Sequence, residues 1–131
     1  MSTQRLIEAT VGVPVAIAAG TDEIWYWTCA HAGTWLVEKI YFTPGTARTA
    51  HDTNNTVISV KNEATEIATE AVTAADAGSL VAGTPIVLAL TGTGTALEVA
   101  QGETLSFLKT DGGTGLALDG YFSVSMRQVN A

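Results

Sequence analysis

The sequence predicts an all-β protein, a single β-sandwich or jelly-roll domain of about eight or nine short, mainly antiparallel strands. Three observations predict this fold class. Clusters of Gly, Thr, Asn and Asp divide the chain into short segments. Within the segments, β-branched and aromatic residues are frequent and apolar positions recur with a period of two. The length of 131 residues suits one domain with its own core.

The N-terminal segment, residues 1–17, is predicted to be an extended arm or an edge strand that precedes a sandwich domain of residues 18–131. Its apolar residues share one parity and therefore one face of a strand: Ile7, Ala9, Val11, Val13, Val15 and Ile17. Pro14 stands at the opposite parity. Because proline has no N–H to donate, the segment should lie at a sheet edge or break near Pro14.

Two strands with apolar residues at both parities are predicted next, over residues 23–31 and 34–43. The residues at one parity are Trp25, Trp27, Trp35, Val37 and Tyr41, and those at the other are Ile24, Tyr26, Leu36, Ile40 and Phe42. A sandwich core covers only one face of a strand. The second face of each strand is therefore expected to meet another chain, a covering loop or solvent.

The rest of the chain is predicted to contain six further strands separated by turns. They are expected at residues 56–61, 65–72, 85–90, 97–99, 104–109 and 121–129. Residues 46–55 are predicted to form a polar loop and residues 74–80 a short helical turn. The glycine-rich stretches 91–95 and 111–115 lack the Gly-Lys-Ser/Thr step of a phosphate-binding loop, so turns are expected there as well.

Composition narrows the class of partner. A net charge of −7 and a pI of about 4.5 disfavour binding to nucleic acid or to an anionic lipid surface. No apolar run reaches the roughly 20 residues of a membrane helix, and no signal-peptide pattern is seen. The chain is therefore expected to be made in the cytoplasm. Hydrophobic residues make up 47% and charged ones 15%, against an average of about 25% charged, which favours an oligomer or a docked surface.

No catalytic, cofactor or metal site is predicted. Cys29 and His31 share one face of a strand, as a nucleophile and its base or half of a metal site would. No third residue orients them, and the other histidine, His51, belongs to the polar loop. A buried thiol and a surface imidazole are expected instead. Because the carboxylates do not converge, the protein is expected not to be an enzyme and to need no cofactor.

Three stretches carry a resemblance to a known family: Gly33–Ile40 (GTWLVEKI), Asp52–Asn62 (DTNNTVISVKN) and Ala100–Phe107 (AQGETLSF). In their order along the chain and their residue pattern, they resemble the small β-sandwich decoration, or cement, proteins of tailed-bacteriophage heads. The resemblance extends from about Thr21 to Val129. The resemblance implies a homotrimer on the outer capsid surface of the virion, made in the host cytoplasm. It also implies that the trimer ties neighbouring major capsid protein subunits together, and that the N-terminal segment reaches the capsid or an adjacent trimer.

The residues predicted to contact a neighbouring copy or the capsid are Ile7, Val11, Val13, Pro14, Trp25, Trp27, Trp35 and Tyr41. A second function stays open at this point, because exposed tryptophans on a β-sheet face stack on sugar rings. In that alternative the chain is a carbohydrate-binding or host-attachment module of a virion fibre. The two functions differ in whether the tryptophans form an open platform or pack in the sandwich.

Overall fold

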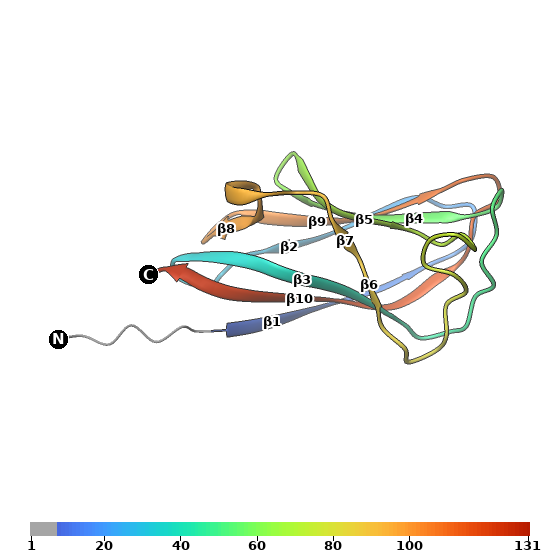
Figure 1. Cartoon of the computed structure of the whole chain (residues 1–131), viewed down its shortest axis with the longest axis horizontal. Coiled ribbons are helices and arrows are strands. Elements are labelled where there is room, and N and C mark those ends of the chain that lie inside the picture. The colour runs from blue at the N-terminus through green and yellow to red at the C-terminus, as the bar shows by residue number, and fades with distance from the viewer. Residues whose placement is uncertain (1–7) are drawn as a thin grey trace.

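The computed structural model describes residues 8–131 as a two-layer β-sandwich, which confirms the predicted all-β fold class (Figure 1). This part of the chain contains ten strands, a single short 3₁₀-helix and no α-helix. The strands are β1 (Glu8–Ile17), β2 (Glu23–Thr28), β3 (Thr34–Pro44), β4 (Thr56–Asn62), β5 (Thr65–Ala71), β6 (Ile86–Val87), β7 (Ala89–Leu90), β8 (Glu98–Ala100), β9 (Thr104–Asp111) and β10 (Leu118–Asn130), and the 3₁₀-helix is η1 (Gly94–Leu97). Among residues 8–131, no helix has the length and apolar character needed to span a membrane.

The strands form two antiparallel sheets. The first, here called the β3 sheet, has the order β1-β10-β3-β6, and β8 also pairs with β3. The second, the β9 sheet, has the order β2-β9-β4-β5-β7. Figure 1 shows them as two stacked layers. The edge strands β1 and β2 contact each other between the layers, so the two open edges lie on the same side.

Three phenylalanines occupy the centre of the core. Phe42 and Phe122 pair across β3 and β10, and their ring centroids are 5.1 Å apart. Phe107 projects from the opposite sheet, and its ring centroid is 4.9 Å from that of Phe122. All three side chains are fully buried. Since Phe122 touches a ring in each layer, it links the two sheets at the middle of the sandwich.

The edge strand β1 accommodates its proline because only one side of the strand is paired. β1 pairs with β10 along its whole length, and Pro14 lies opposite Tyr121 on the outer face. Val13 and Val15 point inward and are buried. An unpaired edge does not require the N–H that proline lacks. Ile7, which belonged to the same predicted face, lies outside the described residues.

A β-bulge interrupts β3. Val37 pairs with Met126 and Lys39 pairs with Ser125, so Glu38 is an extra residue in β3. An extra residue on one strand of an antiparallel pair shifts the alternation of all the side chains that follow it. The prediction by simple alternation is therefore wrong in placing residues before and after Glu38 on a common face, since Trp35 and Val37 do not share the face of Tyr41.

The bulge brings apolar residues of both parities to the core. Trp35 lies before it and Ile40 and Phe42 after it, and all three are buried. Leu36 and Tyr41, which alternate with these residues, are only half-buried and lie on the outer face. The bulge thus buries four large apolar side chains of β3, Val37 included, on one side of the strand.

Residues 85–90 do not form the single strand predicted for them. β6 pairs with β3 in one sheet, and β7 pairs with β5 in the other. Leu88, between these two short strands, is buried, and its N–H donates to the carbonyl of Ile40 at 2.9 Å. The chain therefore crosses from one layer to the other at Leu88. The helical turn predicted at residues 74–80 is also wrong, because this segment forms non-helical turns.

Candidate interaction surface

The three tryptophans predicted to face a partner pack inside the sandwich instead. Trp35 is 4% exposed, and its Nε1 donates to the carbonyl of Ala32 at 3.0 Å. Trp25 and Trp27 lie on the inward face of β2, half-buried against the core. The prediction chose the wrong face of β2. Because tryptophans bury more apolar area than Ile or Tyr, the face of β2 that carries the tryptophans packs against the core.

The predicted interface residues of β1 also divide between two faces. Val13 is buried in the core and Val11 is half-buried beside it. Pro14 is exposed on the outer face of the β3 sheet, and Tyr41 lies on the same face, half-buried. Of the eight predicted contact residues, the structure thus brings Pro14 and Tyr41 to one outer surface.

These two residues belong to a row of apolar side chains that crosses the β3 sheet. Tyr121 lies opposite Pro14 and Val87 lies opposite Tyr41. Tyr41 and Tyr121 are diagonal neighbours, since Ser123 pairs with Tyr41, and such neighbours are within reach of aromatic side chains. Tyr121 is 47% and Val87 is 53% exposed. Pro14, Tyr121, Tyr41 and Val87 are called the tyrosine stripe below.

One ion pair lies on each side of the tyrosine stripe, along the direction of the strands. Towards the start of β10, Nη2 of Arg48 lies 3.7 Å from Oδ1 of Asp119. Towards the end of β10, Nε of Arg127 lies 3.7 Å from Oε2 of Glu38, the bulged residue of β3. An uncharged apolar centre with a charged rim is the usual composition of a protein–protein interface, and tyrosine is enriched at such centres. The stripe therefore has the chemistry of a surface that binds protein.

A second apolar patch lies on the outer face of the β9 sheet. Ile24 and Leu108 pair across β2 and β9, and Tyr26 stands next along β2. Ile24 is 42% and Tyr26 is 66% exposed. They line a shallow hollow of about 470 Å³. The sequence pattern indicated an uncovered apolar face on β2, but that face holds Ile24 and Tyr26 rather than the tryptophans.

Cys29 and His31 do not form a catalytic pair. Cys29 is buried, and its Sγ donates to the backbone carbonyl of His31 at 3.7 Å. The exposed imidazole of His31 packs against two indole rings. Its ring centroid lies 6.0 Å from that of the Trp27 ring and 5.2 Å from that of the Trp35 ring. In residues 8–131, no group of three or more His, Cys, Asp and Glu side chains is placed to hold a metal ion. The predicted buried thiol and surface imidazole are both observed.

Comparison with known proteins adds little to these observations. No protein-family model matches the chain, and no curated protein matches it. A solved structure with some likeness is described as "Structure of infectious bursal disease virus Gx strain". The likeness covers 95% of this chain and 32% of that chain, with 14% sequence identity and a TM-score of 0.42. The chain thus spans about a third of the matched chain, and a likeness this distant does not bear on function.

Proposed function

We propose that the chain is a non-enzymatic structural protein of a tailed-phage virion, made in the host cytoplasm. It binds the outer capsid surface as a homotrimer and stabilises the shell by bridging major capsid protein subunits. The tyrosine stripe is the observation that carries this proposal, because it offers an uncharged apolar surface within a charged rim. The link to a phage capsid rests on the resemblance of the three sequence stretches to cement proteins.

Bridging stabilises a shell without any catalytic step. A protein that binds only the intact shell lowers the free energy of that state relative to its dissociated or ruptured states. A trimer adds to this effect, because once one subunit is bound the others meet the capsid at a high effective concentration. The proposed function therefore requires a repeated binding surface and no reactive group.

The carbohydrate-binding alternative loses its structural basis. It required Trp25, Trp27 and Trp35 to form an open platform for sugar rings. Trp35 is buried, and the other two face the core. Residues 8–131 include all three tryptophans of the sequence and present no exposed group of them on which sugars would stack.

Replacing Tyr121 by serine is expected to weaken capsid binding by about 30-fold or more, the loss of about 2 kcal/mol that defines a hot spot. Tyr121 is 47% exposed, so its truncation removes contact area without opening the core. The measurement is co-sedimentation of purified chain with expanded heads of the phage whose genome encodes it. Titration of the chain against a fixed amount of heads supplies the dissociation constant.

Tyr26→Ser is the matched control, because Tyr26 is an exposed tyrosine on the other sheet. It is expected to bind heads within about twofold of the unmodified chain, since residues outside a hot spot contribute little. Equal losses from both variants would exclude the stripe as the capsid contact. Light scattering tests the trimer separately: a particle of the 13.6 kDa chain mass, rather than three times that mass, would contradict it.

A further inference from the structure

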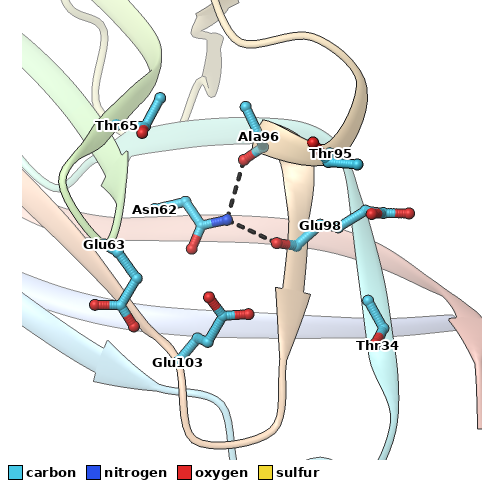
Figure 2. A pocket seen from close by; sticks show the side chains of 8 residues that line it. All are labelled: Thr34, Asn62, Glu63, Thr65, Thr95, Ala96, Glu98 and Glu103. Atoms are coloured by element: carbon cyan, nitrogen blue, oxygen red, sulfur yellow. Dashed lines mark hydrogen bonds between the residues drawn. The ribbon is translucent and has the colours of Figure 1, made fainter.

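A hollow of about 470 Å³ lies where the β4–β5 turn, η1 and the turn before β9 meet (Figure 2). Glu63, Glu98 and Glu103 line it together with Asn62. In Figure 2 the carboxylates of Glu63 and Glu103 are directed towards the same space, whereas that of Glu98 is turned away from it. Residues far apart in the sequence thus place two carboxylates beside one amide.

Backbone hydrogen bonds hold the two carboxylates in place through one oxygen each. Oε1 of Glu63 accepts a hydrogen bond from the N–H of Thr104 at 3.0 Å, and Oε1 of Glu103 accepts one from that of Ala100 at 2.8 Å. The N–H of Glu63 also donates to the carbonyl of Thr104 at 3.0 Å, which fixes the β4–β5 turn against β9. Within residues 8–131, the hydrogen bonds of both carboxylates use Oε1, which leaves Oε2 of each glutamate to bind a cation.

Asn62 provides independent evidence for a ligand. It is 8% exposed, and its Nδ2 donates to the carbonyls of Ala96 at 3.0 Å and Glu98 at 2.7 Å. These two acceptors fix the orientation of the amide, because the flipped amide would place its oxygen against two carbonyl oxygens. Oδ1 is buried and finds no partner in the described part of the chain. Figure 2 shows it directed towards the space between Glu63 and Glu103.

A buried acceptor without a partner loses the hydrogen bonds that water would supply, and native proteins contain few such groups. A cation next to Oδ1 of Asn62 would supply the missing interaction. The same cation would offset the repulsion between the carboxylates of Glu63 and Glu103. One cation in this space would therefore interact with the orphaned oxygen of Asn62 and with both carboxylates.

We propose that this end of the sandwich binds a divalent cation of the calcium type through Oδ1 of Asn62 and Oε2 of Glu63 and Glu103, with water completing the coordination. All of these ligands are oxygens, the donors that suit calcium and magnesium, whereas zinc sites are built mainly from Cys sulfur and His nitrogen. Ca²⁺ accepts carboxylate, amide and water oxygens in flexible arrangements, whereas Mg²⁺ requires near-octahedral geometry and retains its water. Two carboxylates place the dissociation constant at about 0.1–1 mM, as in weakly charged calcium sites.

The cation would join two segments that are about 40 residues apart in the sequence and meet only in the folded chain. Asn62 and Glu63 belong to the end of β4 and its turn, and Glu103 belongs to the turn between β8 and β9. Because the site exists only when these segments are assembled, Ca²⁺ binds the folded chain and not the unfolded one. Calcium is therefore expected to raise the melting temperature of the chain.

The test is a titration of the EDTA-treated chain with CaCl₂ in 150 mM NaCl, followed by ¹H–¹⁵N NMR. The side-chain amide of Asn62 and the backbone amides of Ala100 and Thr104 are expected to shift and saturate with a dissociation constant of about 0.1–1 mM. MgCl₂ is expected to bind more weakly. Shifts spread over all acidic residues without saturation by 10 mM CaCl₂ would overturn the proposal. This measurement uses the unmodified chain, so it does not depend on whether a variant folds.

Glu63→Gln and Glu103→Gln are each expected to raise the dissociation constant for calcium at least tenfold. Without calcium, the NMR spectrum of each variant is expected to remain that of a folded chain. Glu98→Gln is the matched control, since Glu98 lines the same hollow but its carboxylate is turned away. Its dissociation constant is expected to stay within twofold of that of the unmodified chain. An equal loss in Glu98→Gln would mean that calcium responds only to overall negative charge, and the specific site would be rejected.

Discussion

Replacing Lys109 by methionine is expected to lower the free energy of unfolding by about 3–5 kcal/mol, the loss that follows when one partner of a buried ion pair is removed. Lys109 is 1% exposed. Its Nζ donates to both carboxylate oxygens of Asp111 at 2.7 Å, and to the carbonyls of Thr21 at 2.8 Å and Ala18 at 3.3 Å. Methionine fills a similar volume but leaves the carboxylate and both carbonyls without this donor.

The effect is expected to be large because Asp111 is the centre of a wider network. Its Oδ2 accepts a hydrogen bond from the N–H of Gly20 at 2.8 Å, and its Oδ1 accepts one from Oγ1 of Thr56 at 2.8 Å. The network thus joins the β1–β2 loop, β4 and β9. A buried polar network that loses one member keeps the desolvation cost of the others, so the loss exceeds that of a surface pair.

Urea unfolding followed by tryptophan fluorescence measures the effect of Lys109→Met. With a slope of about 1–3 kcal/mol per molar urea, the midpoint is expected to fall by more than 1 M. Lys39→Met is the control, because Lys39 is exposed on β3 and its replacement should change stability by less than about 0.5 kcal/mol. The same midpoint for both variants would show that the buried pair contributes nothing to stability.

A second replacement separates charge from the rest of the network. Lys109→Met combined with Asp111→Leu removes both charges, and replacing a buried ion pair by apolar residues is often nearly neutral. Here Gly20 N–H and Thr56 Oγ1 would still lose their acceptor. The double variant is therefore expected to be more stable than Lys109→Met and less stable than the unmodified chain.

Replacing Phe122 by alanine is also expected to cost about 3–5 kcal/mol, the range for a buried phenylalanine. Phe122 is fully buried, and its ring touches Phe42 in its own sheet and Phe107 in the other. The truncation leaves a cavity at the contact between the two layers. Both the lost apolar transfer energy and the lost ring contacts contribute to this cost.

The same urea measurement tests the Phe122 variant. Ser123→Ala is the matched control, since Ser123 is the next residue of β10 and faces outward. Its replacement should change stability by no more than about 0.5 kcal/mol. A loss below about 1.5 kcal/mol in Phe122→Ala would mean that the sheets close over the cavity and that the three-ring contact is not the centre of the core.

Much of the fold was predictable because local patterns determine it. The alternation of residues 121–129 and the glycine-bounded segments before it predicted strands that the structure contains as β3, β4, β5, β9 and β10. Where the prediction failed, the local structure depends on pairing with a strand that is distant in the sequence. Residues 85–90 carry no signal that separates one strand from a crossing between two sheets, since Leu88 is an ordinary apolar residue in either case.

The candidate surfaces were less predictable than the fold. The presence of an uncovered apolar face on β2 and β3 follows from the sequence, but which face is uncovered does not. On β2 the larger tryptophans take the core, and Ile24 and Tyr26 remain outside. On β3 the bulge at Glu38 brings residues of both parities inward and leaves Tyr41 on the outer face.

The amino-acid sequence alone predicted an all-β sandwich with more apolar strand surface than one core uses, and it predicted a sheet edge or a break at Pro14. Which residues form that surface, the contact of Lys109 with Asp111 and the position of Asn62 beside Glu63 and Glu103 became visible in the folded chain. The physical reason is the range of the interactions. Alternation and turn chemistry act between near neighbours in the chain, whereas parity, bulges and polar clusters depend on strands that pair from distant parts of it.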